Sequence, residues 1–237
     1  MKATSRLSIV TLALAASAFA TSAQAQVVIT TTPLPVLVAP GLTGFATTGA
    51  DMAGLSVTVG FTGGPDTTFA WGVTGPTSGG VFTPNWSLAL TGDSFSSPWV
   101  FSFLNPAGAV LQLRHLALNG TTGLTIFDRT FGGVEGTPGS ANGTDFAYTG
   151  GTCAGCNTLV NYSGQTAIGA APAVGDLWQV VDITFLDGTG PRTNFSFVQD
   201  TDNDIRFMIP EPETYALMLG GLGLMTLVAR RRRSRAG

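Results

Sequence analysis

The C-terminal tail constrains this chain more than any other segment. Residues 214–229 form an apolar run without a charge, and five arginines follow it before the last residue, Gly237. As a helix this run would be about 24 Å long, which a locally thinned membrane and extended arginine side chains can accommodate. Arginines hold their end of a membrane span in the cytoplasm. Everything before the run is therefore predicted to lie on the other side of the membrane.

A short motif, Pro210-Glu211-Pro212, directly precedes the apolar run. The order of triplet, apolar helix and terminal arginines resembles the PEP-CTERM sorting signal of bacterial exosortase substrates. The resemblance covers residues 210–237 and implies that exosortase, a membrane enzyme, cuts near the triplet and releases the preceding domain. It also implies a Gram-negative bacterium that makes exopolysaccharide and builds biofilm. The alternative is an ordinary C-terminal anchor that is never cut.

The N-terminus has the features of a signal peptide. Two basic residues precede the apolar stretch 7–20, and Ala23 and Ala25 form the small-residue pattern at which signal peptides are cut. Residues 1–25 are therefore predicted to be removed, so that the mature protein begins near Gln26. The two ends together predict an exported protein that passes through the inner membrane and reaches the cell surface or the medium.

The segment between the two signals, residues 26–209, is strongly acidic. It contains four arginines and twelve carboxylates, which gives a formal charge of −8, whereas the whole chain has −3. Its length suffices for one domain with a sizeable core. A domain with this charge repels phosphate backbones, so we expect no nucleic-acid partner.

The apolar pattern of residues 26–209 is that of β-strands. Leu55 to Phe61 alternates apolar and small polar residues with a period of two, and five further apolar segments are predicted as strands. Glycine-rich segments such as 63–66, 79–80 and 187–190 are predicted to separate strands. A change of phase at Arg114 indicates a bulge. We expect an all-β fold, an antiparallel β-sandwich that is jelly-roll-like.

Few residues in this domain have the pattern of a catalytic site. His115 is the only histidine of the chain, and no sequence motif supplies it with a nucleophile or an acid. A zinc site would draw on more histidines and cysteines than are present. We therefore predict that the protein is not an enzyme and needs no cofactor.

The two cysteines, Cys153 and Cys156, are spaced as in a redox motif, but they lie in a glycine-rich segment and not at the start of a helix. In an exported domain two cysteines favour a disulfide. We predict a bond between them that fixes a turn, and we keep catalysis or metal binding as alternatives.

Three carboxylates, Asp200, Asp202 and Asp204, alternate just before the sorting signal. Calcium-binding loops present their oxygens with this spacing, but Ile205 occupies the position where an EF-hand requires glycine. An EF-hand is therefore rejected. A simpler calcium site is one interpretation, and a solvated acidic spacer is the other.

The biochemical role is less constrained than the sorting. Structural or adhesive work at the cell surface or in the matrix is the leading hypothesis, with a carbohydrate-binding module as the alternative and a secreted hydrolase third. Sugar binding would require exposed aromatic rings, and Trp86, which follows Pro84 and Asn85, is predicted to be the most exposed of the four tryptophans. The other tryptophans are expected in the core.

Overall fold

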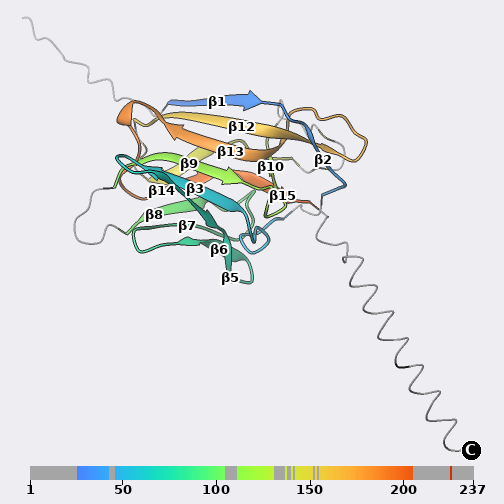
Figure 1. Cartoon of the computed structure of the whole chain (residues 1–237), viewed down its shortest axis with the longest axis horizontal. Coiled ribbons are helices and arrows are strands. Elements are labelled where there is room, and N and C mark those ends of the chain that lie inside the picture. The colour runs from blue at the N-terminus through green and yellow to red at the C-terminus, as the bar shows by residue number, and fades with distance from the viewer. Residues whose placement is uncertain are drawn as a thin grey trace, which may run out of the picture.

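The domain between the two signals folds entirely from β-strands. Up to residue 204 the described residues contain fifteen strands, one 3-10 turn (η2, Leu186–Gly188) and no α-helix. The strands form two sheets that pack face to face (Figure 1). The computed structural model describes residues 26–42, 46–104, 111–130, 142–151 and 155–204, together with Thr137, Ser140, Cys153 and Met225.

The larger sheet has nine strands in the described residues. Six of them lie side by side in the order β1 (Gln26–Thr32), β12 (Asn157–Ile168), β13 (Leu177–Phe185), β9 (Leu113–Asn119), β3 (Ser56–Phe61) and β4 (Asp66–Ala70). Three shorter strands join this row: β2 (Leu37–Ala39) pairs with β12, β10 (Thr125–Asp128) pairs with β13, and β15 (Asp200–Asn203) pairs with β10.

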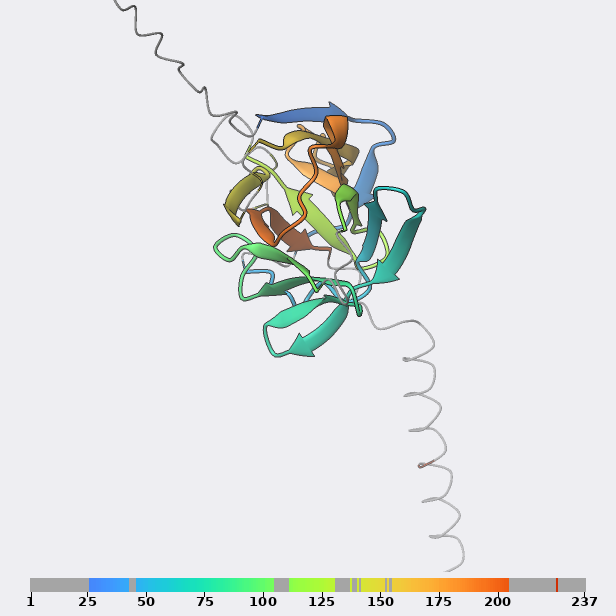
Figure 2. The ribbon, with the colours of Figure 1, turned by 90° about the vertical axis from the view of Figure 1, so that its left-hand side faces the viewer.

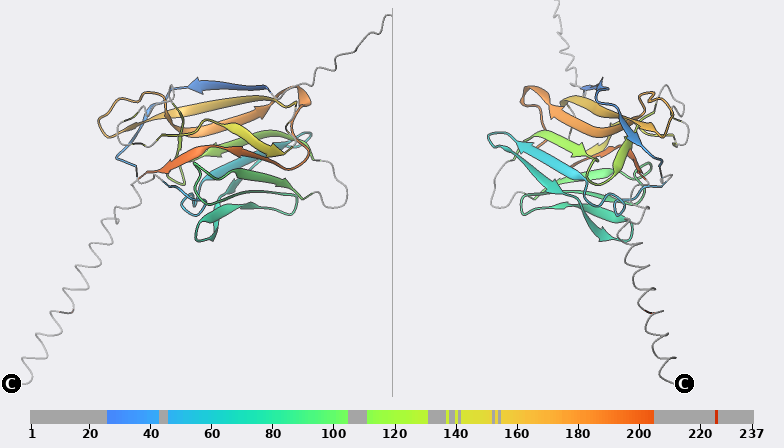
Figure 3. Two further views of the ribbon diagram at one scale, coloured as in Figure 1. Left: turned by 180° about the vertical axis from the view of Figure 1, so that it is seen from behind. Right: turned by 45° about the vertical axis from the view of Figure 1, so that its right-hand side comes forward.

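In the described residues the smaller sheet has six strands. Its β5–β6 hairpin lies at the opposite side of the domain from β1 (Figure 3). The order of its strands is β11 (Ala147–Gly151), β14 (Phe195–Val198), β8 (Trp99–Phe103), β7 (Trp86–Thr91), β6 (Ser78–Phe82) and β5 (Gly72–Gly75).

The core between the sheets is rich in aromatic rings. Trp99 stacks on Phe197 with ring centres 5.9 Å apart, and Trp86 stacks on Phe101 at 5.4 Å. These rings from the smaller sheet face aliphatic side chains of the larger one, such as Val57 of β3. All four tryptophans are buried, so the predicted exposure of Trp86 is wrong: its indole faces the core with only 4% of its surface exposed.

The predicted antiparallel sheet is only partly correct, because the larger sheet is mixed. β1 and β2 both run parallel to β12, with Thr30 beside Asn161 and Val38 beside Ala167, whereas the other pairs are antiparallel. A parallel neighbour needs a long connection, and β1 and β12 are far apart in the sequence. Figure 2 shows the domain turned by 90°, with β1 at one edge of the larger sheet. The jelly-roll arrangement stays a prediction.

The glycine pattern is interpreted correctly at two connections and wrongly at one strand. Residues 63–65 connect β3 to β4, and residues 187–190 lie between β13 and β14, but Gly79 and Gly80 lie inside β6 and do not end a strand. Gly79 is required there because a Cβ atom would lie 2.2 Å from Trp71 Nε1 and 2.1 Å from the carbonyl oxygen of Gly49. The bulge predicted at Arg114 is confirmed by a shift of register between β3 and β9.

Candidate functional site

The outer face of the larger sheet carries rows of short polar side chains. The strand registers place six residues side by side across the sheet, one from each strand: Thr30, Asn161, Asp182, Ala117, Thr58 and Thr68. Several of them are linked across strands: the Oγ1 of Thr30 donates to Asn161 Oδ1 at 3.1 Å, and Thr58 and Thr68 share a hydrogen bond of 2.8 Å. Such cross-strand pairs stabilise a sheet and hold its surface groups in fixed positions.

His115 lies in the neighbouring row of this face, between two carboxylates. Its Nδ1 lies 2.9 Å from Asp66 Oδ2 of β4, and its Nε2 lies 2.9 Å from Asp182 Oδ2 of β13. Arg114 adds an ion pair to Asp66 at 2.5 Å. The sequence predicted neither carboxylate partner, because both come from strands distant in the chain.

The electrostatics of His115 favour its charged form. The hydrogen bond to Asp182 raises the pKa of His115 against the opposing effect of burial, and the charges of Asp182 and Asp66 add to the rise. Burial tends to raise the pKa of Asp182, but its hydrogen bond with His115 lowers it on balance. Since both ring nitrogens are bound to carboxylates, this histidine is not placed to take a proton from a nucleophile. The cluster has the geometry of a structural ion network across three strands.

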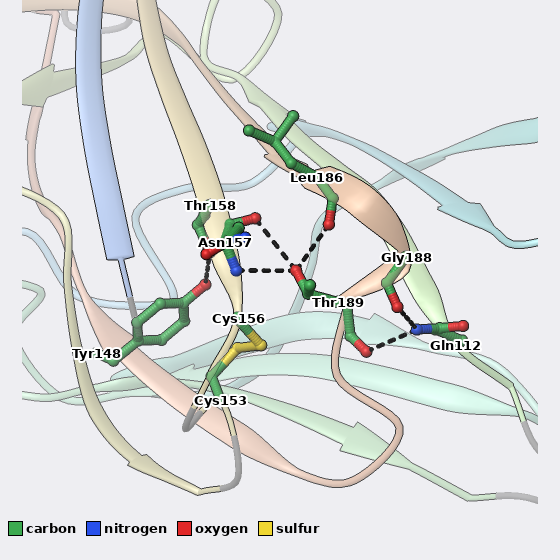
Figure 4. The surroundings of a disulfide bond; sticks show 10 residues. Gln112, Tyr148, Cys153, Cys156, Asn157, Thr158, Leu186, Gly188 and Thr189 are labelled. Atoms are coloured by element: carbon green, nitrogen blue, oxygen red, sulfur yellow. Dashed lines mark hydrogen bonds between the residues drawn. A yellow bond between two sulfur atoms is a disulfide. The ribbon is translucent and has the colours of Figure 1, made fainter. Parts of the chain in front are cut away.

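The structure joins Cys153 to Cys156, with Cα atoms 5.1 Å apart (Figure 4). Both cysteines are buried against the aromatic core, and a turn hydrogen bond runs from the amide of Cys156 to the carbonyl of Cys153 at 3.0 Å. The next residue, Asn157, starts β12, and its amide donates to Thr189 Oγ1 at 2.8 Å. The disulfide therefore fixes the entry to the longest strand, and no described helix begins at either cysteine.

Removing this disulfide should have a small effect on stability. A ring of four residues accounts for about 2 kcal/mol in the loop-closure model, which corresponds to a fall of several degrees in the melting temperature. We expect this from a Cys153→Ala, Cys156→Ala double variant, measured by thermal unfolding beside the wild type. Mass spectrometry of the non-reduced exported protein should find the loop peptide two hydrogens lighter than its reduced form. Two freely alkylatable thiols, or a collapse of the fold, would contradict this prediction.

The three predicted metal-binding aspartates lie in or beside a buried strand. Asp200 and Asp202 belong to β15, and Asp204 follows it and donates its amide to the carbonyl of Leu124 at 2.8 Å. At most 5% of the surface of each residue is exposed, so the interpretation as a solvated spacer is wrong. The neighbours of β15, such as β10 and Ser94, come from other parts of the chain, so the charged segment carries no local signal of its burial.

A fourth carboxylate, Asp128, lies against this strand and was not predicted. The register of β10 and β15 pairs Asp128 with Asp200, and Ile126 with Asp202. Because alternate residues of a strand share a face, the side chains of these four residues lie on one side of the pair. Burial and the charge of Asp202, followed by those of Asp200 and Asp176, raise the pKa of Asp128 to about 9. Burial and the charges of Asp200 and Asp176 raise the pKa of Asp202 to about 8.

The acidic cluster does not bring three metal-binding side chains together. Among the described residues, no group of three or more histidines, cysteines and carboxylates could hold one ion. Asp200 is engaged by Ser94, whose Oγ donates to its Oδ1 at 3.0 Å, and the Oδ2 of Asp176 accepts the amide of Thr137 at 2.6 Å. The predicted set Asp200, Asp202 and Asp204 is therefore not assembled as a three-carboxylate site.

A polar cavity of about 380 Å³ opens beside the edge strand β1. Its walls include Thr31 of β1, Gln165 of β12 and Arg129, which follows β10. Arg129 is held by Asp145 at 2.9 and 3.2 Å, and its guanidinium lies 4.5 Å above the ring of Tyr162. The cavity has the size of a small-ligand site and offers hydroxyl, amide and guanidinium groups.

Beyond the last described strand, residues 209–233 match the family model of the PEP-CTERM protein-sorting motif. The chain is a PEP-CTERM protein. The match begins one residue before the Pro210-Glu211-Pro212 triplet and includes the apolar run and the first arginines, as the sequence predicts. No curated protein and no solved structure matches the chain.

PEP-CTERM signals are recognised by exosortase, so this PEP-CTERM protein is exported and processed at the membrane. The triplet, the signal-peptide site at Ala23 and Ala25, and the helix predicted at 214–229, apart from Met225, lie outside the described residues. In the part of the chain that the structure describes, no helix is long and apolar enough to cross a membrane.

Proposed function

We propose that the exported domain of this PEP-CTERM protein is a non-catalytic structural or adhesive component of the cell surface or extracellular matrix. One observation supports the proposal: across six adjacent strands, the outer face of the larger sheet presents an aligned row in which five residues are polar, including Thr30, Asn161 and Thr58, and one is Ala117. Their hydroxyl and amide groups suit a hydrated polymer such as exopolysaccharide. Each hydrogen bond contributes little, but repetition along a polymer raises the overall affinity.

The burial of the tryptophans and the contacts of His115 support the same proposal. Sugar-binding sites commonly stack rings on exposed aromatics, but here all four tryptophans are in the core. His115, the only histidine, is bound by carboxylates at both nitrogens. The extent of the polar face favours broad contact with a polymer over binding and cleaving a single chain.

Removing hydroxyls from this face should weaken adhesion. Thr184 of β13 lies opposite His115 on the same face. We expect a Thr30→Val, Thr58→Val, Thr184→Val triple variant to bind matrix from the producing bacterium about tenfold less well, because it loses three hydrogen-bonding groups at nearly constant shape. Co-sedimentation of the exported protein with isolated matrix measures the loss. A matched control, Ser102→Ala with Ser196→Ala, removes hydroxyls from the outer face of the smaller sheet and should bind normally. Equal binding by the triple variant, or none by the wild type, would refute the proposal.

Carbohydrate binding in the manner of a dedicated module is the second candidate, and the cavity beside β1 favours it. Arg129, Gln165 and Thr31 could hydrogen-bond a sugar there, and 380 Å³ is enough for one or two rings. A glycan array probed with the exported protein would separate the candidates. Selective binding to a short oligosaccharide, abolished by Gln165→Ala, would favour the module.

A further inference from the structure

Two buried carboxylates at the β10–β15 pair have oxygens without a hydrogen-bond partner. Asp128 is 1% exposed and neither of its oxygens is bonded, and Asp202 is 2% exposed with an unbonded Oδ2. A buried polar atom without a partner is destabilising, and a buried carboxylate is much more so unless a cation or a proton neutralises it. These atoms therefore need a proton or a cation, and the described side chains supply no cation to them.

The described basic side chains are all engaged elsewhere. Arg129 is next to Asp128 in sequence, yet its guanidinium binds Asp145 and lies over the ring of Tyr162. Arg114 binds Asp66, and Arg192 donates to Gln112 Oε1 at 2.8 Å. Within the described residues, then, no arginine or histidine forms an ion pair with Asp128 or Asp202.

Among the described residues, the atoms next to this acidic cluster include hydroxyl and backbone oxygens, whereas both cysteines and His115 are paired elsewhere. The backbone of Gly143 lies so close to Asp128 that a Cβ atom on it would be 2.5 Å from Asp128 Oδ1. Thr47, whose buried Oγ1 also lacks a partner, accepts the amide of Ser94 on its carbonyl, and Ser94 in turn bonds Asp200. Calcium takes six to eight oxygen ligands from carboxylates, carbonyls and water in flexible geometry.

We propose that the carboxylates of Asp128 and Asp202 together bind one calcium ion, with neutral oxygens around them completing its ligands. A site made of two carboxylates and neutral carbonyl or hydroxyl oxygens does not need the three carboxylates that the sequence predicted. Magnesium is a poorer fit, since it demands near-ideal octahedral geometry and keeps several waters. An exported domain meets calcium outside the cell, where sites of modest affinity are sufficient. The site joins β10 to β15, the last strand before the sorting signal.

Calcium added to the purified full-length chain in detergent, first stripped with a chelator, should raise its melting temperature at pH 8. At a free concentration one hundred times the dissociation constant the rise should be about 5–10 °C, by mass action on the folded state. Magnesium chloride at equal concentration should give a smaller rise. Asp128→Asn and Asp202→Asn should each abolish the calcium effect, because each removes a charged ligand at constant shape.

Asp187→Asn serves as the matched control: this aspartate lies in the turn η2, away from β10 and β15, and its variant should retain the full rise. Isothermal titration of the wild type should find one calcium ion per chain, which tests the proposal even if a variant fails to fold. The absence of calcium binding to the wild type at millimolar excess would overturn the proposal. So would a full rise in melting temperature in Asp128→Asn.

Discussion

Replacing Pro210, Glu211 and Pro212 by alanine should keep the protein in the inner membrane. The triplet belongs to the PEP-CTERM motif that exosortase recognises, whereas the apolar run and the arginines that hold it remain intact in this variant. Without the cut, the apolar run anchors the domain. Immunoblots of membrane and medium fractions from the producing bacterium should show the wild type mainly released and the variant almost wholly in the membrane.

Glu213→Ala is the matched control, because it removes an acid immediately after the triplet and leaves the triplet unchanged. It should be released like the wild type. If the alanine-triplet variant and the wild type are released equally, release does not depend on the Pro-Glu-Pro triplet. Retention of both the wild type and the variant would mean that the segment acts as an ordinary anchor in that host.

The parts of the molecule that could be predicted are those encoded locally. A sorting motif is a linear order of residues, and the alternation of Leu55 to Phe61 identifies β3 because a strand with one buried face needs a period of two. Two of the further apolar segments that were predicted as strands, residues 99–104 and 178–186, correspond to β8 and β13. The longest strand, β12, was missed because small and polar residues such as Thr158, Gly164 and Thr166 occupy much of its inward face.

The contacts that determine the candidate sites are not local, and no sequence spacing reveals them. Asp66, His115 and Asp182 meet because β4, β9 and β13 lie close together in one sheet, which depends on the strand order of the whole domain. Asp128 and Asp200 pair across 72 positions in the same way. The burial of β15 was equally hidden, since an aspartate-rich segment is ordinarily solvated and only its tertiary neighbours exclude water here.

With calcium chelated, the domain should lose stability as the pH rises from 5 to 8. Burial raises the pKa of Asp128 from 3.8 to about 9 and that of Asp202 to about 8, so the folded state keeps protons that the unfolded state releases. A raised carboxyl pKa stabilises the fold below the unfolded value, and this contribution is lost as the pH rises through the folded value. Each retained proton changes the free energy of unfolding by about 1.4 kcal/mol per pH unit, or about 3–6 °C in melting temperature.

Asp128→Asn should flatten this profile, because the amide stays neutral at every pH, and it should make the chelated protein more stable than the wild type at pH 8. Other groups contribute in the same direction: Asp200, whose pKa burial raises to about 6, and His115, whose raised pKa acts above pH 6.5. They remain in the variant, so the difference between the two profiles isolates Asp128 and its coupling to Asp202.

The exposed-site control Asp187→Asn should follow the wild type. A variant profile as steep as that of the wild type would mean that Asp128 ionises normally in the folded domain, and that its burial is relieved by a partner in the remaining part of the chain.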